Sequence, residues 1–581
     1  MLKQIGLAVG AILASAGGAL AQTPSNACAS APQVGPGTYA GTTASATNDG
    51  QTSCGNSNSS RDVWLKYVAS NNVELVVETC GLAGWDTVLS LHSGCPGSQG
   101  NTLACNDDSC SLQSRVSRSL ISGETVYIRI GGFGSANGAF SVTVREEEPP
   151  PPPTLGPDVI VGELLGWGRY SAIGGITSFA IGTESCNVGD APIQWIANTN
   201  EHPVIAQNLY RIKDGVFTHV GMSWVKHGFS SVNGTTCGPC TQPPGGSSQL
   251  GVGCSDPYGS GLNGSQGGLG PRSQVNATTG VFQYPPTAPG VTNELSRRLQ
   301  VNTADITPAQ NVGAIYLSES QYVTRDDALW NNALNNASYR RTTIASATAT
   351  PAYSGPTVRR KTAIEGWRDI DPTVTLVPVE YDDGGILVRF WVGAKVINNG
   401  DGTWTYVYAV HNLNSDRSGQ RFTLPRNPGV VISQNTFHAP FSHSGEPYSN
   451  AAWAYTEGGN SIEWSTQTFA QNANANAIRW GTAYTFTIRA NTGPETGTAS
   501  LGLFKPGTPT SLAVQLPVPA GIPCGPDFNG DGFLDFFDLD AFVECFEGVA
   551  CPPGRDADYN GDGFIDFFDA DAFVEDFEAG C

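Results

Sequence analysis

The chain has 581 residues, with 51 acidic and 30 basic side chains and a formal net charge of −21. An acidic chain without clusters of basic residues is a poor candidate for binding nucleic acid or anionic lipid. Its length exceeds what a single hydrophobic core usually serves, so we expect several domains.

The first 21 residues have the pattern of a secretory signal peptide. Lys3 is followed by an apolar run from Ile5 to Ala16 and by the small-residue exit Ala19-Leu20-Ala21. We therefore expect cleavage before Gln22 and a secreted mature protein, either extracellular or at the cell surface. No other stretch is apolar for long enough to span a bilayer, so no transmembrane segment is predicted.

Fourteen cysteines in an exported chain predict disulfide bonds. They fall into three even groups, so each region can close its own bridges, while the pairing within each group stays open. The groups are Cys28, Cys54, Cys80, Cys95, Cys105 and Cys110; Cys186, Cys237, Cys240 and Cys254; and Cys524, Cys545, Cys551 and Cys581.

Residues 22–145 predict a disulfide-bonded antiparallel β-sandwich, because apolar runs of strand length alternate with Gly, Asn and Ser turns. The motifs Asp62-Val-Trp64, Trp85-Asp86-Thr-Val-Leu-Ser-Leu-His and Tyr127-Ile-Arg-Ile-Gly-Gly-Phe resemble the bacterial pre-peptidase C-terminal type of domain. That resemblance implies a non-catalytic accessory domain, of a kind that in some members binds calcium or carbohydrate.

Four oxygen-bearing side chains in this region are candidate metal ligands: Asp86, Asn106, Asp107 and Asp108. They can surround an ion if the turns bring them together, since carboxylate and amide oxygens are the ligands that calcium prefers. The alternative is a solvated acidic turn beside a disulfide.

Residues 146–155 hold three glutamates followed by Pro149 to Pro153, which predicts a stiff linker of polyproline type. Beyond it we expect an irregular, β-rich central domain over residues 156–345, with one helix starting near Thr324 and carrying Trp330 and Ala337 on one face. Residues 346–518 alternate more regularly and predict a second β-sandwich, Ig-like in type.

Candidate catalytic groups in the middle of the chain are histidines and carboxylates. The histidines are His202, His219, His227, His438 and His443, and the carboxylates are Glu201, Glu365, Asp369 and Asp371. Imidazoles can build a metal or hydrolytic site, and a carboxylate pair can hydrolyse glycosides, but no fixed ligand spacing is present. A secreted hydrolase, acting on polysaccharide rather than on peptides, is therefore the alternative function for residues 156–518.

The tetrapeptide Cys237-Gly-Pro-Cys240 has the spacing of a thiol redox motif, which normally opens a helix. The Pro- and Gly-rich sequence that follows it cannot form that helix. We therefore predict structural disulfides, with Cys186 and Cys254 as candidate partners.

Residues 519–581 contain two copies of a twelve-residue calcium loop. A loop of the EF type supplies oxygens from positions 1, 3, 5, 7, 9 and 12 and has glycine at position 6, and both copies fill every position. We therefore predict two calcium ions. The predicted ligands are Asp527, Asn529, Asp531, the Phe533 carbonyl, Asp535 and Asp538 in the first loop, and Asp558, Asn560, Asp562, the Phe564 carbonyl, Asp566 and Asp569 in the second.

Each loop is followed by a predicted helix, because apolar residues recur at helical spacing from Leu539 to Phe546 and from Ala570 to Phe577. Prolines exclude an entering helix before the first loop. Two such loop–helix repeats with Asp at position 12 resemble a dockerin module. The resemblance implies docking of a secreted protein, often a polysaccharide-degrading one, onto a cohesin-like partner through loop positions 10 and 11.

At those two positions this chain has Phe536 and Phe537, and Phe567 and Phe568, instead of small hydroxyl residues. We expect the four rings to fill the core of a small domain with little else to bury, and an exposed docking patch is the alternative.

Net charge is concentrated in the same module. From Cys524 onward there are 16 acidic residues and one basic residue, Arg555, so this segment carries 15 of the 21 net negative charges. Two calcium ions would offset up to four of them.

The sequence thus predicts a mostly β, multi-domain fold with β-sandwich domains and a small C-terminal α module of two calcium loop–helix repeats. The predicted function is that of a secreted, calcium-binding, non-catalytic protein with a C-terminal attachment module.

Overall fold

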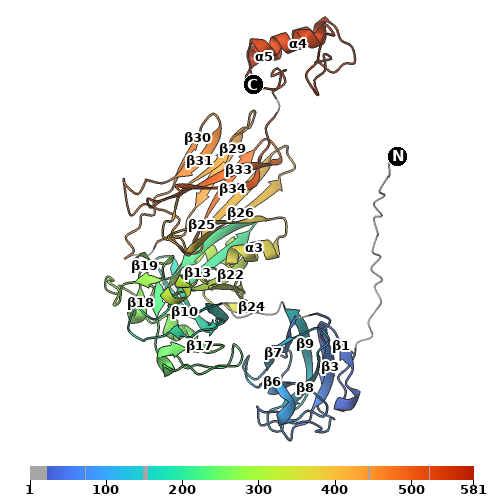
Figure 1. Ribbon diagram of the computed structural model, residues 1–581, viewed down its shortest axis with the longest axis vertical. Coiled ribbons are helices and arrows are strands. Elements are labelled where there is room, and N and C mark those ends of the chain that lie inside the picture. The colour runs from blue at the N-terminus through green and yellow to red at the C-terminus, as the bar shows by residue number, and fades with distance from the viewer. Residues whose placement is uncertain (1–21, 72, 148–154, 443–444, 523, 581) are drawn as a thin grey trace. The chain divides into compact units, whose positions relative to one another are not determined.

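The computed structural model describes residues 22–71, 73–147, 155–442, 445–522 and 524–580. The predicted signal peptide, most of the proline-rich linker and His443 lie outside the described residues. The chain divides into two compact units, Met1–Pro152 and Pro153–Cys581, which are described separately (Figure 1). Both are built mainly from strands, and this confirms the predicted fold class.

The first unit is a β-sandwich of two sheets. One sheet has the order β1 (Gln33–Val34), β3 (Val63–Val68), β8 (Thr125–Gly132), β5 (Thr87–His92) and β6 (Thr102–Asn106); the other has the order β2 (Gly37–Thr42), β9 (Ala139–Glu147), β4 (Val73–Glu78) and β7 (Arg115–Leu120). Alternate side chains of each sheet fill one shared core, for example Leu65, Leu75 and Ile128, all fully buried. Three disulfides close this unit: Cys28–Cys95, Cys54–Cys105 and Cys80–Cys110.

The outer face of the first sheet holds a buried ion pair. Arg129 Nε donates to Asp62 Oδ2 at 2.7 Å, and both side chains are fully buried. Burial raises the pKa of Asp62 to about 6 although Arg129 opposes the shift. Arg129 also donates to Ser57, so it holds the loop that precedes β3 against the sheet.

The second unit begins with an eleven-stranded, antiparallel sheet. Its main path is β10 (Val159–Ile173), β11 (Ile176–Asn187), β21 (Leu299–Asn302), β14 (Val216–Met222), β13 (Val204–Lys213), β22 (Ile315–Val323), β23 (Ala337–Thr343) and β24 (Ala352–Val358), with β15 (Val225–His227), β17 (Ser255–Tyr258) and β18 (Leu269–Gly270) off this path. Two short pairs lie beside it: β12 (Ile193–Gln194) with β16 (Gln249–Leu250), and β19 (Val275–Asn276) with β20 (Val281–Phe282). Strand β24 begins after the expected boundary at residue 345 and pairs with β23.

Two five-stranded sheets follow and share one core. The first is β25 (Thr375–Asp382), β26 (Leu387–Asn398), β27 (Trp404–Asn412), β32 (Thr482–Ala490) and β29 (Ile432–His438); the second is β30 (Ala454–Glu457), β31 (Ser461–Ser465), β28 (Gly419–Pro425), β33 (Pro494–Leu503) and β34 (Ser511–Pro519).

Strand β27 explains how this sandwich joins the eleven-stranded sheet. Tyr406 and Tyr408 point into the sandwich core, while Val407 and Ala409 point into a second core formed with β13, β14 and α3 (Ala363–Ile370). A strand buried on both faces needs a nearly continuous apolar run, and this is the character of its sequence. The expected domains 156–345 and 346–518 therefore share a core.

The helix expected from Thr324 is shorter than its apolar pattern indicated. Helix α2 spans Arg325–Leu329. Asn331 then adopts a left-handed φ of 60°, which ends the helix, Trp330 is 55% exposed, and Ala337 begins β23. A further short helix, α1, spans Ser260–Asn263. Within the described chain, the helices all fall short of the length and apolarity that crossing a bilayer requires.

Candidate calcium sites

The C-terminal module consists of two loop–helix repeats (Figure 1). Helix α4 spans Phe536–Phe546 and helix α5 spans Phe567–Ala579, and these confirm the two predicted helices. Each begins with a capping box in which the Asp at loop position 9 is the N-cap and the Asp at position 12 is N3. The loop and its helix are thus one continuous local structure.

The module core is formed by aromatic rings from equivalent positions of the two repeats. Phe542 of α4 stacks on Phe573 of α5, with ring centroids 4.1 Å apart and an interplanar angle of 2°. Phe528 and Tyr559, also equivalent, each contact both stacked rings edge-on. This arrangement pairs the repeats, so that the two loops depend on one small core.

Within the first loop the predicted ligands accept hydrogen bonds from the loop backbone. Asp527 accepts from Gly530 N (2.9 Å) and Gly532 N (3.0 Å), and Asn529 Oδ1 accepts from Asp531 N (2.8 Å). Their side chains therefore point toward the loop interior. Gly532, at position 6, has a φ of 87°, a left-handed conformation that favours glycine.

The second loop repeats this geometry. Asp558 accepts from Asp562 N (3.0 Å) and Gly563 N (2.8 Å), Asn560 Oδ1 accepts from Asp562 N (2.9 Å), and Gly563 has a φ of 89°. The two loops differ only in whether the first Asp accepts from the amide of position 4 or of position 5, and they share their other quoted hydrogen bonds and the left-handed glycine. This similarity indicates that the sequence pattern specifies the loop conformation.

The position-12 carboxylates, Asp538 and Asp569, are fully buried. Asp538 accepts from Asn529 N (3.1 Å) and Asp535 N (3.0 Å), and Asp569 accepts from the equivalent amides. These backbone N–H groups lower the pKa of Asp569. Arg555, the only basic residue of the module sequence, donates instead to the carbonyls of Cys524 and Asp527.

These residues fit calcium by their chemistry, because they offer only hard oxygen donors at the spacing of a calcium loop. Their carboxylates are held by backbone amides. Across the described chain, a set of three carboxylate oxygens within 4.8 Å of one another occurs in the first unit and not in these loops.

Phe536, Phe537, Phe567 and Phe568 do not lie in the core, and our expectation for them was wrong. Their side chains are 67–74% exposed. The physical reason is that the stacked pair Phe542–Phe573, with its edge-on neighbours, already fills the space between the two short helices.

In the first unit the structure brings together three of the four predicted metal ligands: Asp86, Asp107 and Asp108 each contribute an oxygen within 4.8 Å of the others. Asp86 precedes β5 and Asp107 follows β6, and these strands are antiparallel neighbours with Leu89 opposite Asn106. The start of one strand therefore meets the end of the other. Asn106 itself accepts from Ser109 N and Arg115 N.

The three carboxylates, which we call the head cluster, are electrostatically strained. Burial, with repulsion from Asp108 and Asp86, raises the pKa of Asp107 to about 6. Burial, with repulsion from Asp108, also raises the pKa of Asp86. Oδ1 of Asp86 and Oδ1 of Asp107 are buried without a hydrogen-bond partner. Such a site has a preference for protons or cations.

The cysteines of the tetrapeptide Cys237-Gly-Pro-Cys240 are bonded to other cysteines. The bridges are Cys186–Cys237 and Cys240–Cys254, so the two predicted partners take part, in a pairing that the sequence left open, and this tetrapeptide is structural. A further bridge, Cys545–Cys551, lies in the C-terminal module. Six disulfides among the described residues are typical of proteins in an oxidising compartment.

The described candidate histidines are hydrogen-bonded to the protein or, in the case of His227, packed against aromatic rings. His202 bonds to the carbonyls of Pro203 and Phe229, and His219 bonds to Gly221 O and Ala483 N. Burial lowers the pKa of His202 and of His227 to about 4.

His438 bonds to the carbonyl of His219. Burial lowers the pKa of His438 as well as that of His219, so both rings favour the neutral form.

The candidate carboxylates are dispersed over structural contacts. Glu365 completes the capping box of α3 with Thr362. Asp369 pairs with Lys361, and Asp371 pairs with Lys395. Glu201 is exposed.

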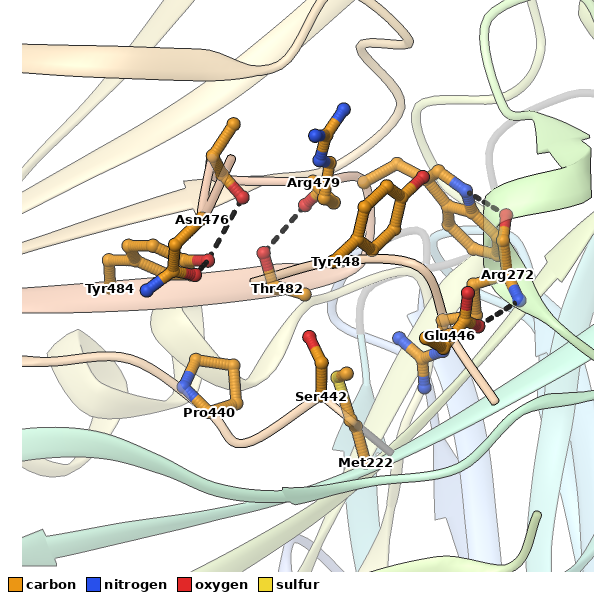
Figure 2. A pocket seen from close by; sticks show the side chains of 12 residues that line it. Met222, Arg272, Pro440, Ser442, Glu446, Tyr448, Asn476, Arg479, Thr482 and Tyr484 are labelled. Carbon is orange, nitrogen blue, oxygen red and sulfur yellow. Dashed lines mark hydrogen bonds between the residues drawn. The ribbon is translucent and has the colours of Figure 1, made fainter. Parts of the chain in front are cut away.

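A pocket in the second unit lies where the eleven-stranded sheet meets the sandwich (Figure 2). Figure 2 shows Glu446 bonded to the backbone of Arg272, and Tyr448 beside Arg479, whose guanidinium lies 4.0 Å from the Tyr448 ring centroid. The volume is about 20 Å³, which suits a water molecule rather than a sugar or peptide. Among the candidate residues that the structure describes, none lines this pocket.

No protein family model matches the chain, and no curated protein matches it. One similar solved structure is a Bacteroides uniformis β-glucuronidase 2, with 10% identity and a TM-score of 0.21 over 49% of this chain and 26% of that chain. The chain thus spans about a quarter of the enzyme's length. Another is the serine-rich repeat adhesion glycoprotein Srr1 of Streptococcus agalactiae, with 8% identity and a TM-score of 0.16 over 62% of this chain and 97% of that chain. At these TM-scores neither likeness bears on fold or function.

Proposed function

We propose that the protein is a secreted, calcium-binding, multi-domain protein whose C-terminal module is ordered by calcium and attaches the chain to a partner. The observation that carries the proposal is the pair of fully buried position-12 carboxylates, Asp538 and Asp569, in a module whose only basic residue is bonded elsewhere. A buried carboxylate is stable when amides or a cation compensate its charge, and here only amides are provided.

In each loop the side chains at positions 1, 3, 5, 9 and 12 and the carbonyl at position 7 would hold the ion. Asp538 and Asp569 would also retain their role as N3 of the following helix, which links ion binding to helix order. Bound calcium supplies positive charge to a segment that otherwise repels itself. The loops and helices should therefore be looser in a chelator than in calcium.

Secretion is supported by the disulfides, by the signal-like first 21 residues and by the low charge of the sandwich regions. An attachment role is supported by the resemblance to dockerin modules, with a cohesin-like partner as the expectation. A carbohydrate ligand of the remaining domains stays a prediction. We propose a non-catalytic role because most of the described candidate histidines and carboxylates serve structural contacts, while Glu201 is exposed and His227 packs only against the rings of Phe282 and Tyr284.

The calcium proposal is tested by hydrogen exchange on the whole secreted chain, with and without calcium. We expect calcium to slow exchange in α4 and α5 and to leave the strands of the sandwich in the second unit unchanged. A matched pair of variants separates ligands from bulk charge: Asp531→Ala with Asp562→Ala should abolish the effect, whereas Asp540→Ala with Asp571→Ala, on exposed helix positions, should preserve it. Equal exchange rates with and without calcium would contradict the proposal.

Catalysis is tested separately, by screening the same chain against glycans and peptides. We expect no turnover. Turnover that disappears on a single carboxylate or histidine substitution would establish the hydrolase alternative instead.

A further inference from the structure

Each repeat of the C-terminal module exposes three phenylalanines. The six residues, which we call the phenylalanine triads, are Phe533, Phe536 and Phe537, and Phe564, Phe567 and Phe568, with exposures of 72, 69, 67, 71, 74 and 67%. Only three other phenylalanines among the described residues are exposed: Phe133, Phe229 and Phe441. Two-thirds of the exposed phenylalanines are thus concentrated in about a tenth of the chain.

The triads are not needed to build the module. The inward faces of α4 and α5 carry Phe542 and Phe573, and these stack with Phe528 and Tyr559 into a closed ring cluster. In contrast, Phe536 and Phe537 occupy the first turn of α4, where the Phe537 amide donates to the capping Asp535 and both rings face solvent. Exposed aromatic residues that recur at equivalent positions of two repeats, and that fold stability does not require, are typical of an interaction surface.

Charge restricts what can cover this surface. The module carries 16 acidic residues and one basic residue, and two calcium ions would offset only four of these charges. A second copy would bring two strongly negative surfaces together, and an anionic membrane would repel the module in the same way. A partner with basic side chains around an apolar centre would complement both features.

We propose that the phenylalanine triads bind a protein partner whose contact face is apolar and rimmed by lysine and arginine. The proposal rests on the proposed function, because calcium must order the loops that hold the rings. The rings would enter apolar depressions on the partner, while the loop carboxylates and the exposed acidic residues of α4 and α5 would face its basic rim. Aromatic anchors of this kind usually supply most of the binding energy of an interface.

The test uses the whole chain in calcium and a labelled amphipathic helical peptide of leucine and lysine as the probe. Its counterpart, with glutamate in place of lysine, is the charge control. Fluorescence anisotropy should show binding of the lysine peptide that weakens as salt rises, and at least about tenfold weaker binding of the glutamate peptide. Equal affinity for the two peptides would contradict the proposal that the partner has a basic rim.

The variants remove four phenylalanines of the triads or, as a control, two exposed phenylalanines outside them. Phe536→Ser, Phe537→Ser, Phe567→Ser and Phe568→Ser together should weaken binding at least about tenfold. Phe133→Ser with Phe441→Ser, which remove exposed rings elsewhere, should leave the affinity unchanged. A variant with leucine at positions 536, 537, 567 and 568 should retain most of the binding. It thus shows whether the serine variant loses affinity through its missing apolar side chains or through misfolding.

Other occupants give distinct results. A calcium-dependent dimer in sedimentation velocity that the serine variant abolishes would assign the triads to a second copy and overturn the proposal. Triad-dependent binding to vesicles of phosphatidylcholine would assign them to a lipid surface and overturn it as well. A calcium titration of the same samples distinguishes failure of the proposed function from failure of this inference. If the native chain takes up no calcium, the proposed function is contradicted. If it takes up calcium but binds the peptide equally well without the triads, only this inference is contradicted.

Discussion

The protein has two acidic regions that differ in how their carboxylates are compensated. In the head cluster, three carboxylates converge from two strands, two of their oxygens lack hydrogen-bond partners, and the pKa of Asp107 is raised. In the C-terminal loops, consecutive carboxylates each accept backbone N–H bonds, and the pKa of Asp569 is lowered. Local density of negative charge therefore does not by itself set protonation: burial and repulsion raise the pKa in the head cluster, and backbone amide donors lower the pKa of Asp569 in the second loop.

The two regions also differ in how they arise from the sequence. Each loop is encoded within twelve residues, so its spacing alone predicts which side chains turn inward. The head cluster depends on the pairing of β5 with β6, with Ser90 opposite Cys105, and this register is invisible in the spacing of Asp86 and Asp107. Local patterns can be predicted from sequence more securely than contacts between strands.

The largest effect is expected from the ring core that positions both loops. Phe573→Ala removes a fully buried ring from the stack with Phe542 and should cost about 3–5 kcal/mol of module stability. Thermal unfolding followed through α4 and α5 measures it. Phe568→Ala, on the same helix but 67% exposed, should change stability by less than about 0.5 kcal/mol. Similar losses in the two variants would mean that the stack is not the core.

The hydrogen bonds within the loops should contribute somewhat less to the stability of the module than its ring core does. Asp538→Ala leaves the amides of Asn529 and Asp535 without their acceptor and should cost about 3 kcal/mol in calcium-free buffer. Asp540→Ala removes an exposed carboxylate of the same helix and should have little effect. Unfolding in urea without calcium isolates the hydrogen bonds from the ion. If both variants unfold alike, the buried amide contacts contribute nothing measurable.

The smallest effect concerns protonation of the head cluster. The pKa of Asp107 is about 6 in the folded protein, above its ordinary value of 3.8. The first unit, which we call the head, binds this proton more tightly when folded than when unfolded, so the contribution to its stability is complete below about pH 4 and is lost as pH rises through 6. Asp107→Asn should therefore stabilise the head at pH 7 by about 1 kcal/mol, after allowance for solvent screening, and make no difference near pH 4.

The difference in stability between the native chain and Asp107→Asn can be measured across the pH range by hydrogen exchange in β5 and β6, with correction for intrinsic exchange rates. The exposed neighbour supplies the control, since Asp108→Asn should give a smaller change. A native head that is more stable at pH 7 than Asp107→Asn, in buffer free of divalent cations, would contradict the strain that we assign to the cluster.

Several features of the fold were predictable because they depend on short-range rules. The helices after both calcium loops, the sandwich of residues 22–145 and the participation of Cys186 and Cys254 in disulfides follow from apolar periodicity, strand alternation and an even cysteine count, whereas the cysteine pairing does not. The phenylalanine pairs were placed wrongly for an equally physical reason. Composition shows that a small domain needs apolar residues, but only the packing shows that Phe528, Phe542 and Phe573 already fill its core.

The junction between the central sheet and the sandwich was also beyond sequence reasoning. The small-residue stretch near residue 345 was expected to separate two domains, yet β24 continues the sheet beyond it and α3 packs in the core that both parts share. A boundary of this kind depends on contacts between β14 and β27 or β32, which lie far apart in the chain.

The central claim is that the two C-terminal loops bind calcium, and calorimetric titration of the whole chain tests it most directly. The account predicts that native protein takes up two more calcium ions than the variant carrying Asp527→Ala and Asp558→Ala, whether or not the head cluster also binds an ion. The variant carrying Asp540→Ala and Asp571→Ala should match the native chain. Equal calcium uptake by the native chain and the loop variant would contradict the account.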